Sequence, residues 1–179
     1  MIRRFRQLSR EVVDTNVIFQ YCKDQVELPD GQVEEYVACV HKGASAVVPV
    51  LPDGRILMVH QYRYAIDRET IEIPAGGRNG TEEPFETAAK RELEEETGYT
   101  PATLTYMGAL LSSPGFTDEV LHMYLARGLK PGECHPDEDE FLERDRVPLG
   151  ELVKEVMDGT IQDAKTVAAV LKAKVLLDL

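Results

Sequence analysis

Three glutamates in the middle of the chain, Glu92, Glu95 and Glu96, are spaced to lie on one face of a helix. Residues three and four apart stack on a helix surface, so these carboxylates would converge and repel one another. A cation between them would remove the repulsion, and hard divalent ions such as Mg²⁺ and Mn²⁺ prefer oxygen ligands. The alternative is a solvated acidic face, which is common in a chain this acidic.

The residues around these glutamates predict a helix with defined ends. Pro84 suits the first helical position, where its missing N–H would have had no partner, and Gly98 stands where a helix needs a left-handed residue to stop. An apolar stripe at steps of three and four predicts the buried face. Its members are Phe85, Ala88, Ala89 and Leu93. Upstream, residues 72–77 predict a strand that runs into a glycine loop and brings backbone carbonyls near the carboxylates.

The stretch from Gly77 to Tyr99 matches Gly-x5-Glu-x7-Arg-Glu-aliphatic-x-Glu-Glu-x-Gly at every specified position. The eight matching residues are Gly77, Glu83, Arg91, Glu92, Leu93, Glu95, Glu96 and Gly98. This pattern resembles the box of the Nudix hydrolases, enzymes that cleave nucleoside diphosphates linked to another moiety. Tyr99 departs from the family, which usually has a bulky aliphatic residue there, and we expect it to change packing but not chemistry. The complete box favours a metal site over a solvated face.

The resemblance implies roles for individual residues. Glu92 and Glu96 would hold the metal ions, Glu95 would assist, and the backbone carbonyl of Ala75 would complete the shell. Arg91 would orient the carboxylates by ion pairing without touching the substrate. The implied cofactor is Mg²⁺, with Mn²⁺ as the alternative ion.

A string further along, Ser113 to Glu119, is similar to the ADP-ribose pyrophosphatase subgroup of this family, in which a proline falls at the position of Pro114. A rigid Pro-Gly turn would present the following side chains towards a pocket. Phe116 would contact a base or ribose, or would be a packed loop aromatic. Asp118 and Glu119 would bond ribose hydroxyls, or would be solvated.

The acidic run that follows His135 lies where this subgroup carries a loop with the catalytic glutamate. A carboxylate near metal-bound water can take its proton as a general base. Glu140 is our first choice for that base and Glu138 the second, because one sequence cannot separate two acids two residues apart.

Two further positions are expected to contact substrate. The subgroup often has arginine at Arg63, where a guanidinium fork can hold the diphosphate or the terminal ribose phosphate through two hydrogen bonds. Glu72, just before Pro74, would contact adenine or the box arginine.

Composition limits the partners of the chain. The 179 residues are 43% hydrophobic and 29% charged, with a net charge of −12. Such an acidic chain is not expected to bind nucleic acid or an anionic membrane, because phosphate backbones require a basic surface. We also expect no membrane span and no secretory signal. The odd number of cysteines, without metal spacing, predicts thiols in a reducing cytoplasm.

Alternating apolar runs predict hairpins in the first seventy residues, with turns at Pro29-Asp30-Gly31 and Pro52-Asp53-Gly54. The predicted strands cover residues 17–28, 33–40, 44–51, 55–59, 71–73, 103–110 and 120–126. Two helical segments follow, one ending at Gly159 and one from Lys165 to Leu177 capped by Asp163. The expected class is α/β: a Nudix-type α/β/α sandwich with a mixed central sheet, plus an N-terminal antiparallel β extension.

The expected division places the extension at residues 1–43 and the Nudix hydrolase domain at residues 44–179. In the similar ADP-ribose pyrophosphatases the extension crosses to a partner subunit and helps to build the substrate site, which implies a homodimer. The alternative is that it covers a sheet edge.

These features predict Mg²⁺-dependent hydrolysis of ADP-ribose to AMP and ribose 5-phosphate. The nearest alternative is a broader pyrophosphatase for nucleoside diphosphate sugars or dinucleotides. A third interpretation is a non-catalytic Nudix domain that senses a nucleotide sugar. The intact box argues against it, because such sensors typically have a degraded box.

Overall fold

A computed structural model describes residues 3–135 and 141–177 of the chain. They form two compact units. The first unit comprises Met1–Lys42 and Leu111–Val120, and the second comprises Gly43–Leu110 and Leu121–Leu179. The first unit thus includes a loop, residues 111–120, that the sequence had placed with the catalytic part.

The second unit is built on short sheets. One sheet has the order β7-β4-β10-β9 and is mixed, because β4 runs parallel to β10 and antiparallel to β7. Its strands are β4 (Ala44–Pro49), β7 (Ala75–Gly77), β9 (Thr103–Leu111) and β10 (Val120–Arg127). An antiparallel sheet has the order β12-β5-β6, with β5 (Arg55–Arg63), β6 (Arg68–Glu72) and β12 (Glu143–Pro148). The short strands β8 (Tyr99–Thr100) and β11 (Lys130–Pro131) pair with each other.

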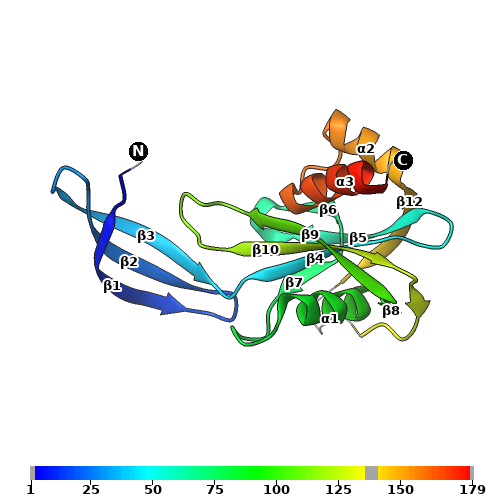
Figure 1. Cartoon of the computed structure of the whole chain (residues 1–179), viewed down its shortest axis with the longest axis horizontal. Helices are drawn as coiled ribbons and strands as arrows, with labels where there is room; N and C mark the ends of the chain where they lie inside the picture. The colour runs from blue at the N-terminus through cyan, green and yellow to red at the C-terminus, as the bar shows by residue number, and fades with distance from the viewer. Residues whose placement is uncertain (1–2, 136–140, 178–179) are drawn as a thin grey trace. The chain divides into compact units, whose positions relative to one another are not determined.

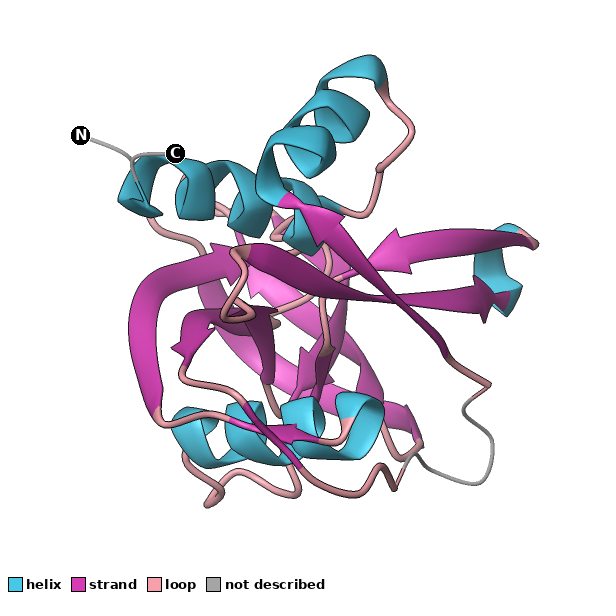
Figure 2. Cartoon of the chain, turned by 90° about the vertical axis from the view of Figure 1, so that its right-hand side faces the viewer, coloured by secondary structure: helices cyan, strands magenta, loops and turns pink. Residues whose placement is uncertain are grey.

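Helices cover both faces of these strands, as expected for an α/β/α sandwich. Figure 1 shows α1 (Phe85–Thr97) on one side and α2 (Leu149–Asp158) with α3 (Ala164–Leu177) on the other, and the turned view in Figure 2 agrees. Gly98 and Gly159 end α1 and α2 with φ angles of 74° and 85°, in the left-handed region that favours glycine. The Asp163 carboxylate accepts the Thr166 N–H at 3.0 Å and so caps α3 as predicted.

Strand β4 lies at the centre, and all six of its residues are buried. Successive side chains point to opposite faces. Ala46 and Val48 therefore join the larger core, which includes residues of α2 and α3, whereas Val47 joins the core beneath α1. The sequence indicated this strand through its apolar residues and the Pro-Asp-Gly turn that follows it.

The first unit contains an antiparallel sheet of the order β1-β2-β3, with β1 (Arg6–Thr15), β2 (Phe19–Glu27) and β3 (Val33–His41). Its β2–β3 hairpin turns at the predicted Pro-Asp-Gly. Strands β1 and β12 were not predicted from the sequence. Pro84 was expected at the first helical position but is the N-cap of α1, with an extended backbone.

Candidate active site

Strand β7 lies directly against the acidic face of α1. The Ala75 N–H donates to Oε2 of Glu96 at 3.1 Å, and Glu96 is only 2% exposed. A Cβ atom at Gly76 would lie 2.3 Å from the carboxyl carbon of Glu92, so glycine is required for the main chain to approach this closely. Two of the box carboxylates are therefore buried against the backbone that carries the Ala75 carbonyl.

Arg91 is shared among three carboxylates on the same helix and the preceding loop. Its Nη1 donates to Glu92 at 2.7 Å and to Glu95 at 2.8 Å, while its Nε donates to Glu83 at 3.1 Å. Burial alone would lower the pKa of Arg91, but the hydrogen bond to Glu83 and the charge of Glu92 outweigh it and raise the pKa. These contacts agree with the expectation that Arg91 orients the carboxylates.

The donor set of this cluster consists of oxygen atoms, which suits a hard divalent cation. Glu92 and Glu96 are both buried, and any side chain at position 76 would fill the space beside them. Within residues 3–135 and 141–177, no group of three or more His, Cys, Asp or Glu side chains is arranged to hold a metal ion by itself. The two carboxylates held against β7 fit a cation that takes the rest of its oxygen shell from main chain and water.

A second cluster surrounds Glu72, which is 1% exposed. Its carboxylate accepts from Arg63 Nε at 2.7 Å and Nη2 at 2.6 Å, from Thr70 Oγ1 at 2.6 Å, and from Lys165 Nζ. Burial alone would raise the pKa of Glu72, but the Arg63 hydrogen bonds and the Lys165 charge lower it to about 2. Glu72 therefore pairs with Arg63 and Lys165 rather than with the box arginine.

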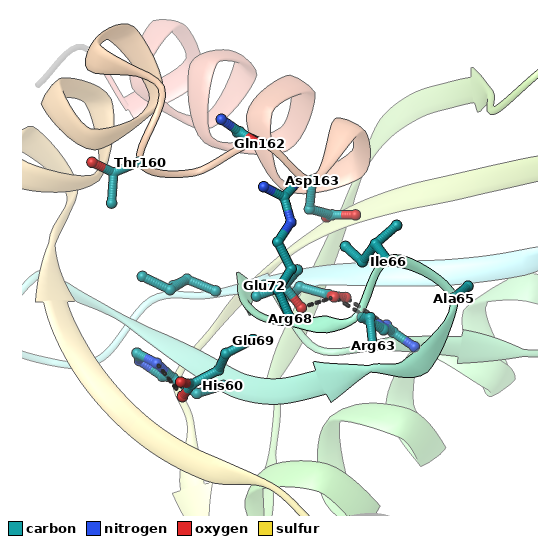
Figure 3. A pocket seen from close by; sticks show the side chains of 12 residues that line it. His60, Arg63, Ala65, Ile66, Arg68, Glu69, Glu72, Thr160, Gln162 and Asp163 are labelled. Atoms are coloured by element: carbon teal, nitrogen blue, oxygen red, sulfur yellow. Dashed lines mark hydrogen bonds and ion pairs between the residues drawn. The ribbon is translucent and has the colours of Figure 1, made fainter.

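Arg63 also lines a cavity of about 550 Å³. Figure 3 shows Arg63 and Arg68 on the β5–β6 side, with Thr160 and Gln162 on the side of the helices. Two of the five N–H groups of Arg63 bind Glu72, and among the described residues the other three have no hydrogen-bond partner. The pKa of Arg63 is raised mainly by its hydrogen bond to Glu72, and the charge of Glu96 adds to this effect.

The predicted loop contacts belong to the first unit. Phe116 is 53% exposed, and its carbonyl accepts the Cys39 N–H at 2.7 Å. Asp118 Oδ1 accepts the His41 N–H at 2.7 Å, and Glu119 lies 3.7 Å from Nδ1 of the same histidine. The Asp118 carboxylate thus fixes the loop to the end of β3. The two candidate bases, Glu138 and Glu140, lie outside the described residues.

Two residues with contacts to these clusters were not foreseen. Lys165 reaches Glu72 across 93 positions of sequence, and Arg144 of β12 donates to the carbonyl of Glu96. Neither stands in a motif. Lys165 is a basic residue at the start of a predicted helix, and Arg144 lies in a charged run before another helix. Neither pattern indicates a tertiary partner.

Comparison with known proteins identifies the class to which this site belongs. A model of the NUDIX domain matches residues 40–170. The chain therefore belongs to the Nudix hydrolase family, as the box indicated.

Its relatives within that family have different names. The chain is 41% identical over 167 residues to the ADP-ribose pyrophosphatase of Bacillus subtilis (strain 168), covering 92% of this chain and 90% of that protein. It is 42% identical over 167 residues to the methanol dehydrogenase activator of Bacillus methanolicus, with the same coverage. A crystal structure of an ADP compounds hydrolase matches with a TM-score of 0.86 over 99% of this chain and 96% of that chain. At 22% identity, that match concerns the fold. Among the described residues, no helix is long and apolar enough to cross a membrane.

Proposed function

We propose that this Nudix hydrolase cleaves ADP-ribose to AMP and ribose 5-phosphate, with Mg²⁺ as its cation. The observation that carries the proposal is the pair of buried carboxylates, Glu92 and Glu96, held against strand β7 with Arg91 beside them. The name of the Bacillus subtilis relative, at 41% identity, supports ADP-ribose as the substrate.

The cation would be held by Glu92 and Glu96, with Glu95 assisting and the Ala75 carbonyl closing the shell. When bound, Mg²⁺ neutralises diphosphate charge and makes water a better nucleophile. The protein contributes the positions: Arg91 fixes the carboxylates of Glu92 and Glu95 through the hydrogen bonds of its Nη1.

The substrate would be oriented by Arg63. Its guanidinium is held by two hydrogen bonds to the Glu72 carboxylate, which would pre-orient its remaining N–H groups for phosphate oxygens. We assign Glu72 to the support of Arg63. For the nucleoside we retain Phe116, Asp118 and Glu119 as contacts; the Phe116 ring is 53% exposed and so has free apolar surface.

In the reaction, water attacks one phosphorus of the diphosphate and the bridging P–O bond breaks. The proton of the water passes to a carboxylate, and the two phosphate monoesters leave. We propose Glu140 as that base, with Glu138 as the alternative. The three free cysteines fit a reducing compartment, and we propose the cytoplasm.

A chromatographic assay tests the substrate. The purified chain is incubated with ADP-ribose, ADP-glucose, NADH and GDP-mannose in Mg²⁺, and the products are separated. We expect the highest kcat/KM for ADP-ribose, with AMP and ribose 5-phosphate in equal amounts. Preference for another of the four would move the substrate to the broader class. Tight binding of ADP-ribose without turnover would favour a sensor over an enzyme.

The Bacillus methanolicus relative supports a second candidate, activation of a dehydrogenase. The same purified chain can be added to a methanol dehydrogenase. An increase in the dehydrogenase rate that is lost when the box is mutated would show that hydrolysis serves activation. An unchanged dehydrogenase rate would leave ADP-ribose hydrolysis as the one proposed function.

We further propose a homodimer formed through the sheet of the first unit. Val12 pairs with Cys22 and Tyr36 pairs with Asp24 across the sheet, which places these side chains on one face. Val12 and Tyr36 are 50% and 43% exposed, and Phe5 packs edge-on against Tyr36 at 5.9 Å. A second copy is the occupant that would bury this apolar surface.

Light scattering after size exclusion tests the dimer. We expect a dimer mass for the wild type and a monomer mass for Val12→Asp. Val37→Asp is the matched control, because Val37 is 46% exposed but pairs with Lys23 on the opposite face. A monomeric wild type would overturn the proposal.

A further inference from the structure

The last turn of α1 is tied from behind by residues 132–135, which we call the strap. The Gly132 N–H donates to the Gly98 carbonyl at 2.6 Å, and the His135 N–H donates to the Glu95 carbonyl at 3.2 Å. The Cys134 thiol donates to the same Glu95 carbonyl at 3.0 Å. Carbonyls at a helix C-terminus lack partners within the helix. Here the strap supplies them, next to the carboxylates of the box.

Arg144 of β12 joins the strap to the helix. Its Nε donates to the Glu96 carbonyl at 2.6 Å, and its Nη2 donates to Cys134 Sγ. The last turn of α1 contains no basic residue of its own. A helix C-terminus favours a positive charge, and Arg144 supplies it here from strand β12.

Glu96 is consequently held at both ends. Its carboxylate accepts the Ala75 N–H, and its main-chain carbonyl accepts the Arg144 Nε–H. The pairing of Arg144 with Val59 of β5 anchors the arginine in the sheet. The position of the Glu96 carboxylate relative to β7 therefore depends on a guanidinium on the far side of the helix turn.

We propose that Arg144 is a positioning residue for the cation site, setting the last turn of α1 so that Glu92 and Glu96 meet a divalent ion. The effect of Arg144 on turnover rests on the proposed function, but its effect on cation affinity can be measured without the reaction. Partners behind a metal ligand typically change metal affinity by about 10–100-fold when removed.

Two other roles for Arg144 make different predictions. An effect of charge alone would strengthen cation binding when Arg144 is removed, because one positive charge leaves the neighbourhood. A merely structural role would lower thermal stability without changing cation affinity. Positioning predicts weaker binding despite the lost positive charge.

The test compares Arg144→Ala with Arg146→Ala. Arg146 lies two residues further along the same strand, carries the same charge, and donates to the Tyr99 hydroxyl at 3.2 Å instead of a helix carbonyl. Mn²⁺ binding is measured by calorimetry, and the Mg²⁺ dependence of ADP-ribose hydrolysis is measured in parallel. We expect about tenfold weaker Mn²⁺ binding and an equally raised Mg²⁺ requirement for Arg144→Ala. The KM for ADP-ribose at saturating Mg²⁺ should stay within about twofold, because Arg144 binds the helix and not the substrate. Arg146→Ala should match the wild type.

Arg144→Lys should recover part of the loss, because an ammonium can donate to the Glu96 carbonyl but lacks the fork that also reaches Cys134. If Arg144→Ala does not fold, Cys134→Ala removes one arm of the link and should weaken Mn²⁺ binding by about threefold. Unchanged or tighter binding in the folded variants would overturn the proposal, as would equal losses in Arg144→Ala and Arg146→Ala. A wild type that binds Mn²⁺ but does not hydrolyse ADP-ribose would refute the proposed substrate and leave the role of Arg144 decided by the binding data.

Discussion

Two glutamate clusters in the second unit combine acidic and basic side chains in opposite proportions. In one, Glu72 receives hydrogen bonds and charge from both Arg63 and Lys165. In the other, Arg91 is divided among Glu83, Glu92 and Glu95. One carboxylate with two cations is a satisfied ion-pair network, whereas three carboxylates around one arginine form a site that still attracts positive charge.

This difference indicates that the Glu72 cluster stabilises the fold and that the Arg91 cluster belongs to the reaction site. Burial of a carboxylate is costly unless it is paired and hydrogen-bonded, and Glu72 meets that condition with protein groups. Glu92 and Glu96 are also buried, but Glu92 shares Arg91 with Glu83 and Glu95, and Glu96 accepts the main-chain N–H of Ala75 at β7. We therefore expect substitutions at Glu72 to act mainly on stability and substitutions at Glu96 to act mainly on turnover.

The largest effect is expected for Glu96→Gln. Glutamine keeps an oxygen that can accept the Ala75 N–H, so the fold should survive, but it removes the charge that binds the cation. Turnover of ADP-ribose should fall by about a thousandfold, with the melting temperature close to that of the wild type. Turnover near the wild-type value would refute the assignment of Glu96 as a metal ligand.

Glu72→Gln should show the reverse balance. It leaves the Arg63 and Lys165 charges without their carboxylate, and loss of one partner from a buried ion pair is strongly destabilising. We expect the free energy of unfolding, measured with urea at pH 7, to fall by about 3 kcal/mol. A change no larger than that of Glu69→Gln, an exposed acid on the same strand, would show that the network contributes little.

The stability difference between wild type and Glu72→Gln should depend on pH. The pKa of Glu72 is about 2 in the folded chain, against an ordinary value of 4.5. Because folding lowers this pKa, its contribution is complete above pH 4.5 and is lost as the pH falls towards 2. The stability difference between wild type and Glu72→Gln should therefore shrink between pH 4.5 and pH 2, as seen in urea titrations at several pH values. A constant difference over that range would contradict the lowered pKa.

A smaller effect is expected for Gly76→Ala. Its Cβ would lie 2.3 Å from the Glu92 carboxyl carbon, so the carboxylate must move. We expect turnover to fall by about tenfold, because small displacements of a reacting group are costly. Gly77→Ala is the matched control, since a Cβ there meets no heavy atom within 4 Å. Equal activities of the two variants would show that the position of Glu92 is not critical.

The sequence predicted the parts of the fold that local rules control. Gly98, Gly159 and Asp163 marked helix ends correctly, because a left-handed C-cap and a side-chain N-cap each need a particular residue type. Strand β4 was visible because its apolar residues precede a Pro-Asp-Gly turn. The acidic face of α1 was visible because the helix period places Glu92 and Glu96 together.

Other parts could not be predicted from local patterns. All ten residues of β1 are exposed, and the residues of β12 are mostly charged, so neither strand has the apolar alternation that marks a half-buried strand. The contact between Lys165 and Glu72 spans 93 positions, and that between Arg144 and Glu96 spans 48. Only the tertiary fold brings these charges together. The predicted role of Arg63 in binding phosphate stays a prediction, and its pairing with Glu72 was not foreseen.

The central claim is that the box cluster requires a divalent cation and the Glu72 cluster does not. It is tested most directly by Mn²⁺ calorimetry on wild type, Glu96→Gln and Glu72→Gln under conditions where all three are folded. We predict saturable binding to wild type and Glu72→Gln, and binding weakened by at least about tenfold in Glu96→Gln. Equal binding by all three proteins, or loss of binding in Glu72→Gln alone, would contradict it.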